Sequence, residues 1–237
     1  MSLTGIFIVF AFFFSSSFCE IPKVKDLESF LNNALETDKP IHLVIGNSFE
    51  SEPGTAIFVS REEGTRRMRA LACSEEPELA MIFLPQWSVW ITETTLRLSD
   101  ETRIDTRYLE AAVLSGAEVE HWHTHTNFSE QRFGEEEKRK KLIQWTMPSP
   151  DDLLQLYVFY REIPEGKLTG VIASTHGITR YWNYEPGWAG AIYVRFAVRA
   201  EAHNLYMETR KLSVSQLSRF AQSHQGFIKL SFDRYPN

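Results

Sequence analysis

Short apolar runs separated by turn residues restrict the fold of this chain more than any other feature. The runs are Ile41–Ile45, Ala56–Ser60, Met68–Cys73, Ala80–Leu84 and Ser88–Thr95. Gly, Pro, Asn and Glu-rich turns separate them, which is typical of hairpins in an antiparallel or mixed sheet. Arg61 to Gly64 is read as one of these turns. We therefore expect an α/β protein built around such a sheet.

Apolar residues at helical spacing predict the elements that flank the sheet. Helices are expected over Lys23–Glu36, Arg107–Gly116, Asp151–Ile163, Ile192–Leu212 and Ser213–Ser223. Further strands are expected over Ala117–His123, Lys167–Ser174, Ile178–Tyr184 and Phe227–Phe232. The pair on either side of Thr175-His176-Gly177 should form a hairpin, because it encloses a short turn.

The first 19 residues carry no charged side chain, and Ile6–Phe14 is an unbroken apolar run. Ser15-Ser-Ser-Phe-Cys19 follows it, with small residues at Ser17 and Cys19. This is the layout of a secretory signal peptide cleaved near that cysteine. We expect a secreted or periplasmic protein, with membrane attachment only if the segment is retained as an anchor or a lipidated N-terminus. The mature chain would keep Cys73, which we expect to be a small core residue on a strand.

Composition narrows the class of protein. The chain has 237 residues, of which 43% are hydrophobic and 24% charged, so an intrinsically disordered chain is excluded. Its 25 basic and 31 acidic residues give a net charge of −6, which argues against a nucleic-acid partner. Two cysteines cannot make a disulfide-stapled scaffold.

The segment His121-Trp-His123-Thr-His125 carries the first candidate chemistry. Residues i and i+2 of a strand point to the same side, so His123 and His125 should project together. Two imidazoles and one carboxylate make a typical catalytic zinc site, in which a fourth position stays open. His121 shares that face and is either a group that supports the ligands or a surface histidine.

A carboxylate is available downstream, in Ser149-Pro150-Asp151-Asp152. Taken alone, this segment indicates a helix N-terminus, because Ser is a good N-cap, Pro suits the first helical position and Asp suits the first turn.

The two segments together resemble the JAMM (JAB or MPN+) metallopeptidase signature, which is a Glu, then H-[S/T]-H, then S-x-x-D. His123-Thr124-His125 and Ser149 to Asp152 match it, over a region of roughly residues 50–185. Thr126 stands where the family usually has Pro. The gap between the two motifs is about twice the common one and contains a charged insertion at about 128–146, which is most simply a solvated helix or an excursion.

The resemblance implies a JAB/MPN-like fold over residues 20–185, which is a mixed sheet flanked by helices in a cytidine-deaminase-like layout. Residues 186–237 would form a helical extension packed on the same domain. His123, His125 and Asp152 would hold Zn²⁺, and Ser149 would help stabilise the oxyanion. A Glu would act as general base: Glu52 fits best, Glu78 is the alternative, and Glu36 and Glu50 are weaker candidates.

The implied activity is zinc-dependent hydrolysis of peptide or isopeptide bonds. The implied partner is a peptide or protein substrate, a class that includes ubiquitin-like and isopeptide-linked proteins. Two other interpretations stay open, a JAB-like scaffold without activity and an exported zinc-binding protein.

Overall fold

A computed structural model supplies the structure. It describes residues 23–35, 40–74, 76–97, 102–126, 146–162, 167–182, 199–201, 203–205, 207–209, 211–224 and 228–235. The predicted signal peptide and nearly all of the charged insertion lie outside these residues. No helix in the described part of the chain is long and apolar enough to cross a membrane.

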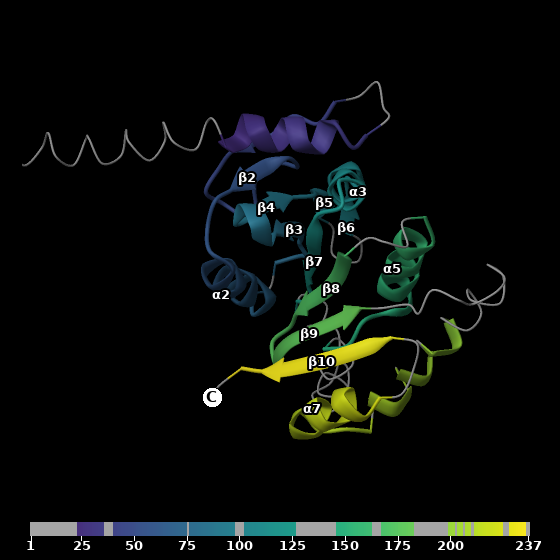
Figure 1. Cartoon of the computed structure of the whole chain (residues 1–237). Helices are drawn as coiled ribbons and strands as arrows, with labels where there is room; N and C mark the ends of the chain where they lie inside the picture. Colours follow the sequence, from purple (N-terminus) through teal and green to yellow (C-terminus); the bar gives the residue numbers. More distant parts are fainter. Residues whose placement is uncertain are drawn as a thin grey trace, which may run out of the picture.

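An eight-stranded mixed sheet forms the centre of the molecule (Figure 1). Its strands are β1 (Val44–Ile45), β2 (Thr55–Ile57), β3 (Ala80–Leu84), β4 (Val89–Thr92), β7 (Glu118–Thr124), β8 (Lys167–Ala173), β9 (Gly177–Trp182) and β10 (Lys229–Arg234). Their spatial order is β1-β2-β4-β3-β7-β8-β9-β10. The pairs β1–β2 and β7–β8 are parallel, and the other pairs are antiparallel. Strands β5 (Thr94–Arg97) and β6 (Thr102–Ile104) form a separate hairpin.

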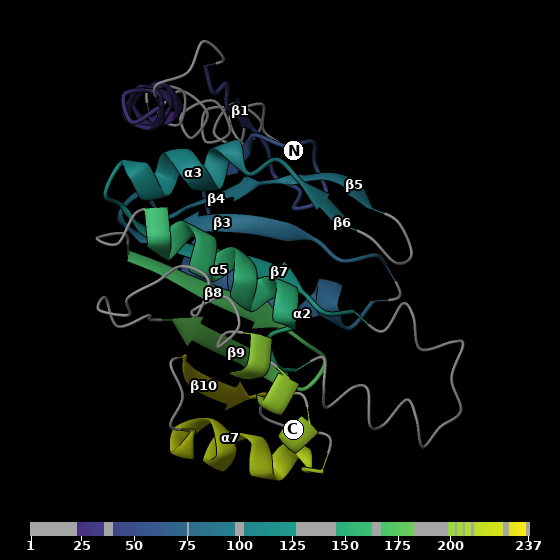
Figure 2. The same cartoon turned by 90° about the vertical axis from the view of Figure 1, so that its right-hand side faces the viewer.

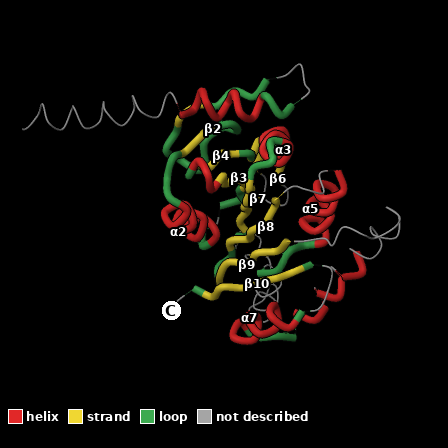
Figure 3. The backbone as a smooth tube through the Cα atoms, viewed as in Figure 1, coloured by secondary structure: helices red, strands yellow, loops and turns green. Residues whose placement is uncertain are grey.

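Helices cover both faces of the sheet. Helix α2 (Arg61–Ala72) lies on one face, and α3 (Arg107–Leu114) and α5 (Pro150–Glu162) lie on the other (Figures 1 and 2). The tube in Figure 3 shows the same layers, with helices on both sides of the strands. A helix over 23–32 and α7 (Val214–Ser223) also bury apolar side chains in the core on the α3 and α5 side.

Strand β7 lies at the middle of the sheet and separates two apolar clusters. Val119 belongs to the core on the α3 and α5 side, whereas Trp122 belongs to the core on the α2 side. Odd-numbered residues of β7 therefore face α3 and α5, because side chains alternate along a strand. This alternation puts His121 and His123 on the face that α5 covers.

Most of the predicted elements are confirmed. Strand β3 has the predicted bounds, and α3, α5, β7 and the β8–β9 hairpin lie close to where the periodicity placed them. Helical residues at 199–201, 203–205 and 207–209 agree with the helix predicted over Ile192–Leu212, and the predicted last strand is β10. The general fold class, an α/β protein with a mixed sheet and flanking helices, is therefore confirmed.

The strand predicted over Met68–Cys73, and the turn predicted before it, are wrong. Ser60 accepts a hydrogen bond from the backbone N–H of Glu63 and starts α2, which runs through Ala72. The buried face of α2 consists of Gly64, Met68 and Ala72, at intervals of four residues. Gly64 serves close packing and not a turn, since a Cβ there would lie 2.0 Å from the Trp90 ring. Cys73 caps the end of α2 and is exposed, so it is not a core residue.

The run Ser88–Thr95 was predicted as one strand, but it is divided. Strand β4 ends at Thr92, and β5 begins at Thr94 in the separate hairpin. The chain changes sheets at Glu93, whose side chain is fully buried. A pattern of apolar residues cannot predict that a buried charged residue divides the run in two.

Candidate metal centre

The C-terminal end of β7 carries two of the three predicted metal ligands. His123 is paired with Ala80 of β3 on one side and with Ile172 of β8 on the other. His125 follows the strand, and its backbone N–H donates to the carbonyl of Ala173. Two neighbouring strands thus fix the backbone of both histidines on one face of the sheet.

The third predicted ligand comes from the start of α5. The backbone N–H of Asp152 donates to Ser149 Oγ at 3.2 Å, and the N–H of Ser149 donates to Asp152 Oδ2 at 2.6 Å. Pro150 occupies the first turn, as expected for a residue whose missing N–H has no helical partner. The segment is therefore a capping box, and the same capping box aims Asp152 at the histidines.

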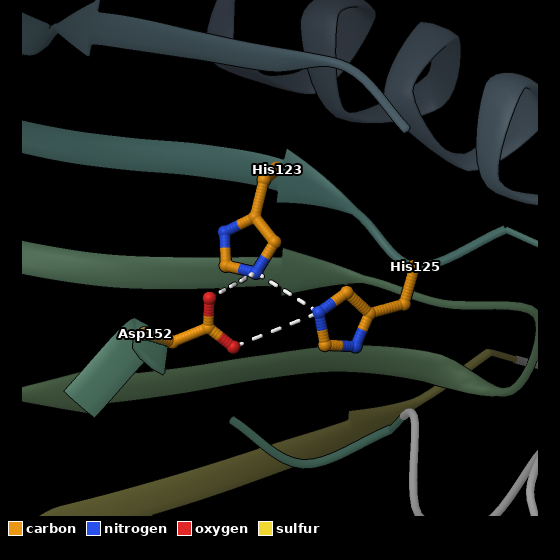
Figure 4. A group of neighbouring side chains, drawn as sticks. All are labelled: His123, His125 and Asp152. Atoms are coloured by element: carbon orange, nitrogen blue, oxygen red, sulfur yellow. Dashed lines mark hydrogen bonds and ion pairs between the residues drawn. The ribbon is translucent and has the colours of Figure 1, made fainter. Parts of the chain in front are cut away.

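The three side chains converge, as Figure 4 shows. His123 Nε2 lies 3.1 Å from His125 Nε2 and 3.3 Å from Asp152 Oδ1. Asp152 Oδ2 lies 3.7 Å from His125 Nε2. The exposed fractions of the side chains of His123, His125 and Asp152 are 11%, 9% and 18%, so the group is shielded but reachable.

These separations suit a metal ion. Ligand atoms about 2.0–2.1 Å from a tetrahedral zinc are about 3.3–3.4 Å apart. The two imidazole nitrogens are 3.1 Å apart, and each lies 3.3 or 3.7 Å from a different oxygen of the Asp152 carboxylate. One ligand atom from each residue lies within 4.8 Å of the others. Three protein ligands of this chemistry leave a fourth position for water or substrate. The group formed by His123, His125 and Asp152 can therefore hold a metal ion.

Electrostatics within the group favour a charged Asp152. Burial would raise the pKa of this carboxyl, but His123, His125 and the N–H of Ser149 outweigh burial and hold the pKa well below its usual range. Burial would also lower the pKa of His123, but the carboxylates of Asp152 and Glu78 outweigh it and raise that pKa above 6.5. In the metal-free protein, a protonated His123 therefore supplies part of the positive charge that a bound metal ion would supply.

Affinity for a metal ion should consequently fall in acid. Protons and the metal ion compete for the same imidazole nitrogens, so the affinity should fall about tenfold per pH unit for each proton that the metal must displace. Because the pKa of His123 is raised, this loss should begin above pH 6.5. Titration against a chelator at a series of pH values measures it, and a constant affinity below pH 6 would contradict it.

The same pKa shifts predict how the stability of the metal-free protein depends on pH. The ion pair of His123 contributes free energy of unfolding fully below pH 6.5, and this contribution is lost as the pH rises through the raised pKa. The contribution of Asp152 is present above its unfolded pKa of 3.8 and is lost only in stronger acid, as the pH falls toward its lowered folded pKa.

Glu78 is not a member of this group, but its carboxylate is close enough to raise the pKa of His123. Strands β3 and β7 pair Ala80 with His123, and the Thr124 backbone N–H donates to the Leu79 carbonyl. Continuing this register puts Glu78 opposite His125, and directly opposite residues of antiparallel strands share a face. Thr102 Oγ1 donates to the Glu78 carbonyl at 3.2 Å and fixes its backbone, while its side chain is exposed.

Glu52, the preferred general base in the sequence, lies elsewhere. It is exposed in the connection between β1 and β2, and its carbonyl accepts a hydrogen bond from Thr92 Oγ1 at the end of β4. Strands β4 and β3 separate β2 from the histidines. The structure does not bring the side chain of Glu52 into the group of three ligands. Glu50 is also exposed in the β1–β2 connection, and Glu36 lies outside the described residues.

Two buried polar residues near the ligands were not recognised as a pair in the sequence. His121 Nε2 lies 3.1 Å from Glu93 Oε2, on the same face as His123. The alternation of β7 already indicated the position of His121. Nothing in the sequence indicated Glu93, because the strand that ends before it is joined to β7 only through β3.

Comparison with known proteins adds no relative. No protein-family model, no curated protein and no solved structure matches this chain. Any inference about function therefore rests on the two short motifs and on the geometry of the His123, His125 and Asp152 group.

Proposed function

We propose that this chain is a zinc-dependent hydrolase of peptide or isopeptide bonds, with a site of the JAMM type. The observation that carries the proposal is the convergence of His123 Nε2, His125 Nε2 and the Asp152 carboxylate from β7 and α5. This ligand set is typical of catalytic zinc sites, in which one coordination position is free for reaction.

The ligand residues are prepared for a cation. The histidines, with a smaller contribution from the N–H of Ser149, lower the pKa of Asp152 and keep it charged. The capping box orients Asp152, and the strand pairing of β7 fixes both imidazoles. When bound, zinc supplies polarisation of the scissile carbonyl and activation of a water molecule. The side chains of the protein do the rest: they orient the substrate, move the proton and stabilise the developing charge.

Glu78 is the general base that the register supports best. Its carboxylate shares a face with His125 and acts electrostatically on His123, so it lies near the group. It would accept a proton from the attacking water and return it to the leaving amine. Exposure of Glu78 is consistent with this role, because the base must meet water that enters from outside.

Ser149 is placed to stabilise an oxyanion. Its Oγ accepts the N–H of Asp152, which leaves the hydroxyl hydrogen free to donate. A donor at this position, next to the carboxylate ligand, could approach the oxygen of a tetrahedral intermediate. The proposed substrate is a peptide or protein, and export of the chain would favour a substrate outside the cytosol.

The experiment that tests the proposal is removal and restoration of the metal. Purified protein should contain about one zinc per chain, because one group of ligands is present in the described residues. Peptides and isopeptide-linked substrates should be cleaved, and a chelator should abolish cleavage until zinc is restored. Protein that neither contains zinc nor takes it up would overturn the proposal. Stoichiometric zinc without cleavage would indicate a zinc-binding protein or an inactive scaffold.

A further inference from the structure

Glu93 is a buried carboxylate close to the candidate metal centre. Its side chain has no exposed surface, and neither carboxylate oxygen has a hydrogen-bond partner among the described residues. The partner recorded within ion-pair distance is His121 Nε2, 3.1 Å from Oε2. That nitrogen is also without a hydrogen bond in this part of the chain, so the pair is close but not aligned for a hydrogen bond.

The strand register puts Glu93 in line with a metal ligand. The backbone N–H of Glu93 donates to the carbonyl of Ala80, and Ala80 is paired with His123. Glu93, Ala80 and His123 therefore form one row across the sheet. Ala80 is the middle residue of this row and has no charge. No charged side chain of the row therefore lies between Glu93 and His123. His121 lies beside the row, with its ring centroid 6.2 Å from that of His123.

Glu120 is a second buried carboxylate in this fold, and both of its oxygens have partners. Glu120 lies on β7 but faces α2, and it is also buried. One of its oxygens accepts the Trp122 indole N–H at 2.9 Å, and the other pairs with Arg61. Burying a carboxylate without such hydrogen bonds is unfavourable. Glu93 has none of the hydrogen-bond donors that Glu120 has among the described residues.

The missing positive charge is available in the candidate metal centre. Two neutral imidazoles and one carboxylate neutralise only one of the two charges of a divalent cation. We propose that Glu93, held beside His121, supplies the second negative charge that balances the bound ion. Glu93 then stabilises the ion in two ways. Its negative charge attracts the ion across the sheet, and its contact with His121 holds that ring beside the ligand His123. This inference rests on the proposed zinc site.

The test is the zinc affinity of Glu93→Gln, measured by competition with a chelator. The variant keeps the shape of the side chain and removes its charge. We expect an affinity loss of about 10- to 100-fold, which is the usual effect of groups that support metal ligands. Glu93→Asp keeps the charge and should restore part of the affinity.

Glu120→Gln is the matched control, since it makes the same chemical change on the opposite face. It should lower the melting temperature, because Arg61 loses its partner, and leave the zinc affinity unchanged. Metal-free Glu93→Gln should melt no lower than the metal-free wild type, because the Glu93 carboxylate makes no hydrogen bond among the described residues that the variant could lose.

Two results would overturn the role of Glu93. The first is wild-type zinc affinity in Glu93→Gln; if the metal-free variant also melts lower than the wild type, Glu93 and His121 form a structural ion pair. The second is an equal affinity loss in Glu93→Gln and Glu120→Gln, which would indicate general damage to packing. If the wild type binds no divalent cation, the proposed function fails, and the role of Glu93 fails with it.

Discussion

His123→Ala is expected to abolish zinc binding and hydrolysis together. The substitution removes the nitrogen that lies 3.1 Å from His125 Nε2 and 3.3 Å from Asp152 Oδ1. Two ligands from the protein would remain, which is one fewer than catalytic zinc sites use. Changes in groups that merely support ligands cost 10–100-fold in affinity, so loss of a ligand should cost more than about 100-fold.

Metal analysis of the purified variant, together with chelator competition, measures this effect. His203→Ala provides the matched control, because His203 is exposed on the helix near the C-terminus and lies outside the ligand group. The control should keep full zinc content and activity. Zinc bound at wild-type stoichiometry and affinity by His123→Ala would exclude these residues as the metal centre.

The candidate metal ligands could be picked out in the sequence because each motif is local. His123 and His125 are two residues apart on one strand, so alternation alone puts them on one face. The capping box of Ser149 and Asp152 is equally local, since it depends on four consecutive residues. Local pattern alone could not show that these motifs meet, because their contact depends on how α5 packs over β7 and β8; the resemblance to the JAMM signature alone implied it.

Helix α2 could not be predicted for a different reason. Its buried face is made of Gly64, Met68 and Ala72, two of which are small, and the rest of the helix is rich in Arg and Glu. Such a helix buries little apolar surface, so its periodicity is weak. The reason for a small residue is clear only when the side chain that packs against it is known: Gly64 leaves room for the ring of Trp90.

The general base depends on strand order, which is a long-range property. Glu52 and Glu78 both precede an apolar run, and the sequence offered no physical way to separate them. The antiparallel pairing of β3 with β7 puts the start of β3 beside the histidines, whereas β2 is two strands further away. Register therefore distinguishes two glutamates that local sequence pattern treats alike.

Glu78→Gln is expected to lower hydrolysis by about 10²- to 10⁴-fold, which is the usual contribution of a general acid or base. The amide has the same shape as the carboxylate but cannot accept the proton of the attacking water. None of the three proposed zinc ligands changes, so zinc stoichiometry should stay at the wild-type value. Glu52→Gln is the matched control, because Glu52 is also exposed in a loop before a strand and should tolerate the change.

The comparison of these two variants separates three mechanisms. Inactive Glu78→Gln with normal zinc content, beside active Glu52→Gln, supports hydrolysis with Glu78 as the base. The reverse result would mean that the β1–β2 connection moves toward the histidines during catalysis and would exclude Glu78. Full activity in both variants would exclude both glutamates as the base and would require another proton acceptor at the site. Because both substitutions remove one negative charge and no ligand, a difference between them reports proton transfer and not the overall charge of the protein.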